Sequence, residues 1–184
     1  FAVLRGRHPD ALRVSARTSA GFDLLLELLD QQGGFSRKSL EVDYDIYAEG
    51  EAELGWLNAS VTVRAEQPFA LDDLLVGIID RLRQELAEQG AETSHLKAIG
   101  LGEGFFGVAT LISGDSRTEL SLPSRCEVRE VDLIINARVA CDPAILQALV
   151  EPATREAAAM VGAEVEFRQT QSFRPGRPVP THRL

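Results

Sequence analysis

Two stretches of the chain place apolar side chains at every second position, and an amphipathic helix pattern follows each of them. The alternation covers residues 57–65 and 131–139, and it predicts two strands that each bury one face. Apolar positions then recur at helical spacing over residues 71–89 and 143–161, and a glycine follows each helix as a stop signal. The two strands also have similar sequences, LNASVTV and INARVAC. A strand and a helix are therefore repeated along the chain.

Further strands are expected after each helix. Residues 95–101 and 108–112 have strand patterns joined by the glycine-rich turn GLGEGFFG, and residues 165–167 begin a last strand. The polar segment 113–129 is expected to be a mobile excursion with a short strand near Leu120. Strand–helix–strand, occurring twice with antiparallel pieces between, predicts an α+β fold. It is the split βαβ arrangement of ferredoxin-like domains, with both helices on one face of an antiparallel sheet.

Two prolines are expected to interrupt these elements. Pro68 should end the first strand, and Pro152 should kink the second helix or divide it in two. Asp142 and Pro143 fit the N-cap and the first position of that helix.

The first residues of the chain follow a different pattern. Leu12 and Val14 alternate with polar neighbours as in a short strand, a small polar turn follows, and residues 22–29 repeat apolar side chains at helical spacing. Such a strand buries nothing by itself, because parallel strands need neighbours on both sides. The sequence thus divides into a terminal strand and helix (1–34), an acidic and aromatic connector (35–56), a ferredoxin-like domain (57–173) and a basic, proline-rich tail (174–184).

Composition narrows the classes of function. The net charge of −9 argues against nonspecific binding of nucleic acid, which needs a basic face. No apolar run approaches the roughly 18 residues of a membrane span, so no membrane partner is expected. The two cysteines, Cys126 and Cys141, form no C-x-x-C pair, and nothing resembles a signal peptide, so a cytoplasmic location is expected. Whether the protein is an oligomer stays open.

Few stretches carry recognisable chemistry. Gly102, Gly104 and Gly107 spell G-x-G-x-x-G, but a strand rather than a helix follows them, which favours a hairpin over a phosphate loop. The chain contains no G-x-S-x-G, H-E-x-x-H or Walker A sequence, so no catalytic residue is predicted. Sequence spacing gives no support for a metal site formed by the histidines and cysteines, and the metal ligands are unknown.

Two charged segments are candidates for binding a partner. Asp43, Asp45 and Glu49 belong to the acidic stretch EVDYDIYAEGEAELGWLN, which either meets a metal ion or cationic partner or is a solvated face. In that stretch Tyr44, Tyr47 and Trp56 are expected to be packing anchors. The basic tail supplies the other candidates, which would hold an acidic partner, a phosphate or the acidic stretch, or else lie on their own domain: Arg174, Arg177 and Arg183.

The N-terminal pattern resembles a known family. VSARTSAGFDLLLELL is similar to the last strand, guanine-recognition turn and final helix of a P-loop GTPase, with Ser15, Ala16 and Arg17 at the positions of the turn. DYDIYAEGEAELGWLN and FRPGRPVPTHR resemble the C-terminal region of CobW-like GTPases, the cobalamin-synthesis branch of their family. The resemblance spans nearly the whole chain except the segment around residues 113–129.

The resemblance implies GTP-dependent delivery of a transition metal, such as zinc or cobalt, to a client protein that requires it. The family's Walker A lysine, magnesium ligands and Cys-x-Cys-Cys motif lie in an N-terminal portion, and none occurs in these 184 residues. The chain is therefore expected to bind GTP and magnesium only with a P-loop portion, supplied by missing residues or by another chain. The alternative is a noncatalytic ferredoxin-like binding or assembly module, in which residues 11–29 serve for docking.

Overall fold

The computed structural model describes residues 2–9, 11–16, 18–30 and 53–176. Internal contacts divide the chain into two units, Phe1–Glu41 and Val42–Leu184. The described part of the first unit contains two helices, α1 (Ala2–Arg7) and α2 (Phe22–Asp30). The strand expected at residues 12–14 is wrong, because the described residues of this unit include no neighbouring strand with which it could pair.

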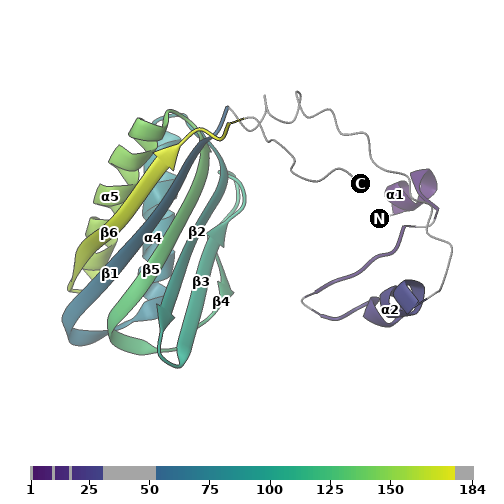
Figure 1. Ribbon diagram of the computed structural model, residues 1–184, viewed down its shortest axis with the longest axis horizontal. Helices are drawn as coiled ribbons and strands as arrows, with labels where there is room; N and C mark the ends of the chain where they lie inside the picture. Colours follow the sequence, from purple (N-terminus) through teal and green to yellow (C-terminus); the bar gives the residue numbers. More distant parts are fainter. Residues whose placement is uncertain (1, 10, 17, 31–52, 177–184) are drawn as a thin grey trace. The chain divides into compact units, whose positions relative to one another are not determined.

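The second unit is an α+β domain built on a six-stranded antiparallel sheet with the strand order β4-β3-β2-β5-β1-β6. Helices α4 (Leu71–Glu88) and α5 (Pro143–Met160) contact each other and lie behind the sheet in the view of Figure 1. The prediction that both helices cover one face is confirmed. The strands are β1 (Gly55–Ala70), β2 (Glu92–Gly102), β3 (Phe105–Leu111), β4 (Glu119–Leu122), β5 (Glu127–Ala140) and β6 (Ala163–Phe173).

The core lies between the sheet and the two helices. Alternate residues of β1 and β5 point into it, and the apolar stripe of α4 closes it from the other side. Its largest members, each less than 2% exposed, are Leu57, Leu71, Leu74, Leu75, Ile78, Ile79, Leu82, Leu86, Leu96, Leu111, Leu133 and Ile135.

Pro68 does not end β1 as predicted, and Pro152 does not divide α5 in two. β1 continues to Ala70, and Pro68 lies in an irregular stretch where the pairing with β5 shifts register between Arg64 and Phe69. A proline is tolerated there because the ladder needs no N–H donor at a bulge. α5 runs through Pro152 undivided, and the Thr154 hydroxyl donates to the Val150 carbonyl at 2.7 Å in the same turns.

The glycines of GLGEGFFG have structural roles. Gly104 has a φ of +82° in the turn between β2 and β3, which confirms the hairpin. Gly107 pairs with Gly100 on the neighbouring strand, and together they leave a hollow beneath α4. A Cβ on Gly100 would lie 2.8 Å from the Leu71 side chain, and one on Gly107 would lie 3.0 Å from that of Leu75. The helix therefore rests on strands that lack side chains at this point.

Asp72 in the first turn of α4 holds the segment that leads into β5. Its carboxylate accepts hydrogen bonds from the Ser124 amide at 2.8 Å, the Ser124 hydroxyl at 2.7 Å and the Arg125 amide at 2.9 Å. Burial raises the pKa of Asp72, but these hydrogen bonds together outweigh it, so that the pKa lies below its usual value.

Asp72→Asn is expected to lower the free energy of unfolding by about 1 kcal/mol at pH 7, because the loop loses a charged acceptor. Since the folded-state pKa is lowered, this stabilisation is present above the unfolded-state pKa of about 3.9 and is lost as pH falls through the folded value. Urea unfolding of both proteins at pH 7, 5 and 3 should show the difference shrinking with acidity.

The matched control is Asp73→Asn, which removes the same charge from the same turn of α4. Asp73 is exposed and makes no hydrogen bond to the loop among the described residues. Equal losses for the two variants would contradict a specific role for Asp72 and leave only a helix-dipole effect.

Candidate functional site

The turn before α2 contains two of the three residues at the expected guanine-contact positions. The Ser15 amide donates to the Ala20 carbonyl at 3.0 Å and closes the turn, and Gly21 has a φ of +79° immediately before the helix. The Ser15 N–H donates within the turn, so it is not free to contact a base. A contact to a base carbonyl would come from the backbone N–H of Ala16, which is an exposed residue. Arg17 lies outside the described residues.

Of the candidates for binding a partner, the structure describes Arg174 alone. Its guanidinium donates to the Glu53 carbonyl at 3.0 Å and to the Cys141 carbonyl at 3.5 Å, at the ends of β1 and β5. Arg174 thus holds backbone groups of its own domain. The remaining candidates lie outside the described residues: Asp43, Asp45, Glu49, Arg177 and Arg183.

The described part of the chain contains no candidate metal-binding site. Residues 2–9, 11–16, 18–30 and 53–176 contain no group of three or more His, Cys, Asp or Glu side chains that could hold a metal ion. Cys126 and Cys141 are unpaired thiols, and burial, followed by the nearby Asp142, raises the pKa of Cys141. This favours the unreactive thiol over the thiolate that binds metals.

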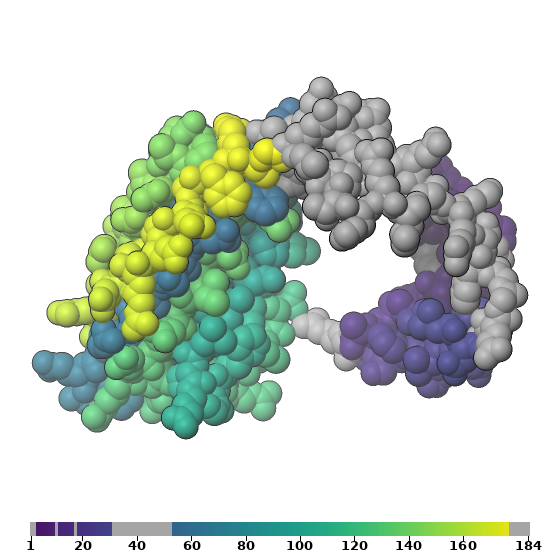
Figure 2. Space-filling model, in the orientation of Figure 1, coloured from purple at the N-terminus to yellow at the C-terminus, as the bar shows by residue number. Residues whose placement is uncertain are grey.

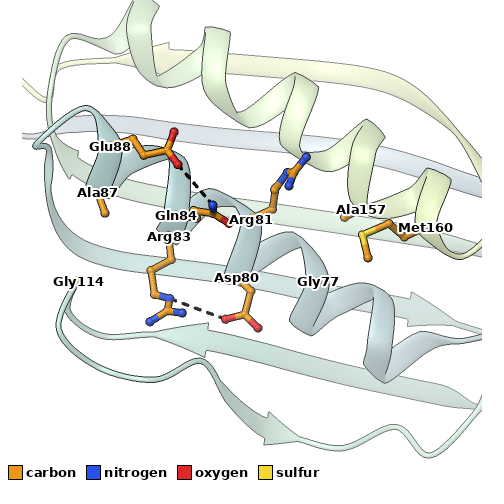
Figure 3. Close-up of a pocket in the computed structure, with 10 residues that line it drawn as sticks. All are labelled: Gly77, Asp80, Arg81, Arg83, Gln84, Ala87, Glu88, Gly114, Ala157 and Met160. Carbon is orange, nitrogen blue, oxygen red and sulfur yellow. Dashed lines mark hydrogen bonds and ion pairs between the residues drawn. The ribbon is translucent and has the colours of Figure 1, made fainter.

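A groove of about 780 Å³ runs along the helix layer (Figure 3). It is shallow where Gly77 on α4 meets Ala157 on α5, since a Cβ on Gly77 would lie 3.8 Å from that of Ala157. Its arginines are neutralised: Arg81 binds Glu156 and Glu85, while Arg83 lies 3.8 Å from Asp80. Of these ion pairs, the one between Arg81 and Glu156 joins α4 to α5, and the other two lie within α4.

No helix among residues 53–176 covers the opposite face of the sheet (Figure 2). Four apolar side chains form a cross-strand row on this face, since Ile99 pairs with both Ile134 and Val108, and Val108 pairs with Leu122. Phe106, 43% exposed, follows on the next outward position of β3. We call Ile99, Val108, Leu122 and Ile134 the apolar row.

Polar and cationic residues gather beside the apolar row. Arg138 on β5 pairs with Trp56 on β1 and with His95 on β2, and two residues further along Asn136 pairs with Asn58 and Lys97. They line a hollow of about 500 Å³. We call this set the basic cluster: Trp56, Asn58, His95, Lys97, Asn136 and Arg138.

Close contacts fix the geometry of the basic cluster. The Arg138 guanidinium carbon lies 3.9 Å from the centre of the Trp56 ring, a cation–π arrangement, and Phe173 contacts the same ring at 6.1 Å between centroids. The Asn136 amide donates to the Asn58 carbonyl oxygen at 2.7 Å. The expected packing anchor Trp56 therefore packs on the open face, half-buried, rather than in the core.

The cluster has a positive potential. The pKa of His95 lies below its usual value, first because of partial burial and then because of the charges on Lys97 and Arg138. Sequence reasoning missed these residues because each stands at an outward strand position, which normally marks a solvated face. The sequence did contain one indication of the cluster, which is the kind of residue at these positions. Trp56, Arg138 and Lys97 are unusual surface residues in an acidic chain.

Comparison with protein-family models, with curated proteins and with solved structures finds no match for the chain. Among the described residues, no helix is both long enough and apolar enough to cross a membrane.

Proposed function

We propose that the chain is the C-terminal portion of a CobW-like, GTP-dependent metallochaperone that acts in the cytoplasm. The turn at Ser15, Ala16 and Arg17 contributes a guanine contact to a nucleotide site whose P-loop lies outside these 184 residues. The domain after it binds the client protein that receives a metal such as zinc or cobalt. GTP and magnesium supply the phosphate chemistry when bound, and the present residues contribute recognition of the base.

The observation that carries this proposal is the local geometry of residues 15–16 and 18–22. A closed turn with an exposed Ala16 leads through Gly21 directly into α2, which is the order of turn and helix that the resemblance implies, although the described residues before the turn form no strand. The helix exposes apolar side chains, since Leu24, Leu26 and Leu29 are exposed and α2 has no fully buried residue. A helix of that kind needs a further surface to cover it, and a P-loop domain would provide one.

The proposed ferredoxin-like architecture of the second domain is supported by its strand order. The two repeated units, β1–α4–β2 and β5–α5–β6, contribute the four strands in the order β2-β5-β1-β6. Within this arrangement β3 and β4 extend the sheet beyond β2. The apolar row on the uncovered face then gives the client protein a surface to bury.

Ala16→Pro tests the base contact in the protein joined to its P-loop portion. The substitution removes the Ala16 N–H and should reduce the preference for GTP over ATP by about tenfold, the effect of one hydrogen bond of about 1.4 kcal/mol. Ala16→Ser keeps the N–H and should keep the preference. Equilibrium affinities for both nucleotides provide the measurement.

Unchanged selectivity in Ala16→Pro would contradict a guanine contact by this turn. It would favour the second candidate, a noncatalytic ferredoxin-like assembly module. That alternative is supported by the apolar row, which serves a binding partner whether or not a nucleotide takes part.

A further inference from the structure

We infer that the basic cluster is a binding site for the phosphoryl group of a small-molecule ligand. The juxtaposition that carries this is Arg138, His95 and Lys97 on two adjacent strands, beside the ring of Trp56, around one hollow. The inference does not depend on the proposed GTPase function, because it concerns a different unit of the chain.

The spacing of the two cations, Lys97 and Arg138, and of the His95 imidazole suits a single anion. His95 stands directly opposite Arg138, where paired strands hold Cβ atoms about 5 Å apart. Lys97 follows two positions along the same strand and on the same face, about 7 Å further. Long flexible side chains with this spacing can converge on one group. A phosphoryl group offers three acceptor oxygens and a charge of about −1.5 to −2, which matches several cationic donors at once.

The positive side chains of the cluster differ from the other arginines on the same face of the sheet in having no acidic partner among the described residues. Arg64 binds Glu130 at 3.1 Å and Glu166 at 2.9 Å, and Arg168 lies 3.5 Å from Asp132. Within residues 53–176, neither His95 nor Lys97 has an ion pair, and no Asp or Glu lines the hollow. The chain has a net charge of −9, so composition alone would predict an acidic surface. A group of positive side chains without acidic partners is the opposite of that expectation.

Hydrogen-bond donors complete the site. The bond between the two asparagines leaves the amide group of Asn58 to donate outward, because it uses the Asn58 carbonyl oxygen. An extra residue, Ser94, interrupts the pairing of β2 with β5 at the rim of the hollow. Bulges of this kind commonly re-aim side chains beside binding sites.

The size of the hollow sets the class of ligand. About 500 Å³ lies within the range of about 300 to 1,000 Å³ typical of small-molecule sites. The half-buried ring of Trp56 and its neighbour Phe173 provide apolar surface for the part of the ligand that carries the phosphoryl group. The site therefore fits a phosphorylated metabolite better than free phosphate alone.

The test uses the full chain with inorganic phosphate and pyrophosphate as probes, at constant ionic strength set with NaCl. Trp56 is the single tryptophan, so its indole N–H resonance and fluorescence report on the cluster without ambiguity. We expect saturable shifts of the indole signal and a rise in the pKa of His95, because a bound anion favours the imidazolium. His95→Gln assigns the histidine resonance.

Lys97→Gln and Arg138→Gln should each weaken pyrophosphate binding about tenfold or more, the effect of losing one charge-assisted hydrogen bond. Arg168→Gln removes the same charge from the same sheet face and should leave binding unchanged. Circular dichroism checks the fold of each variant. Should a variant not fold, the rise in the His95 pKa of the unsubstituted chain still decides the matter.

Three outcomes would overturn the inference. Pyrophosphate could leave the indole resonance and the His95 pKa unmoved. Lys97→Gln and Arg138→Gln could bind pyrophosphate as tightly as Arg168→Gln does. Citrate could saturate the site where pyrophosphate does not, which would assign it to carboxylates instead.

Discussion

Leu75→Ala is expected to lower the free energy of unfolding of the second domain by about 2–5 kcal/mol, the range for deleting a fully buried leucine side chain. Leu75 is 0% exposed on α4, and its side chain fills the hollow above Gly107. Because the strands carry no side chain at Gly100 and Gly107, nothing on the sheet can move in to replace the lost leucine. The cost should therefore fall in the upper part of that range.

Urea or guanidinium unfolding measures this prediction, with Leu122→Ala as the control. Leu122 is 45% exposed in the apolar row, so its truncation should cost less than about 1 kcal/mol. Gly107→Ala adds a methyl group toward Leu75 and should be better tolerated in the Leu75→Ala background than alone, as expected for side chains in contact. Additive effects, or similar losses for Leu75→Ala and Leu122→Ala, would contradict the packing of α4 on the two glycines.

The elements of the second domain could be predicted because one face of each is buried. In β1 and β5 that burial imposes a period of two, and in α4 and α5 a helical period, so the apolar pattern marks both type and position. The short strand near Leu120 was also predicted and is confirmed as β4. The Asp142 carboxylate accepts from the Ala144 amide at 2.8 Å, as expected for an N-cap.

The errors have a common physical origin. The alternation at residues 12–14 satisfies the local strand pattern, but a strand forms only when a neighbour pairs with it. Pro68 breaks a regular strand in isolation, whereas in the folded domain a register shift in the pairing of β1 with β5 accommodates it. Local rules failed where long-range contacts decided the outcome.

The basic cluster could not be predicted, because its members come from three separate strands. Trp56, His95 and Arg138 are neighbours only through the register of β1 with β5 and of β5 with β2. A shift of one residue in either pairing would turn a member toward the core. The Ser94 bulge, which also has no sequence signature here, sets the final alignment of His95 with Arg138.

The 184-residue chain by itself is expected to show no micromolar affinity for GTP, whereas joining it to a P-loop portion should produce such affinity. Base contacts supply specificity, but the phosphates and magnesium supply most of the binding energy through the P-loop amides and lysine. The turn at Ser15 and Ala16 can add only a hydrogen bond or two. The expected change, from millimolar or weaker to micromolar, is about a thousandfold, or about 4 kcal/mol.

Binding of nucleotide at the basic cluster can be distinguished from binding at the turn, because a site for the phosphoryl group alone would have similar affinities for GTP and ATP. Binding that depends on the base therefore reports on the turn, and binding that Arg138→Gln removes reports on the cluster. Comparing both nucleotides on the unsubstituted chain and on Arg138→Gln separates the two sites.

Calorimetry with GTP and magnesium tests the central proposal most directly, on the chain alone and on the chain joined to a P-loop portion. The proposal predicts no guanine-selective micromolar binding to the chain alone and micromolar binding, with a preference for GTP over ATP, to the joined protein. Micromolar, guanine-selective binding by the chain alone, or no binding by the joined protein, would contradict it.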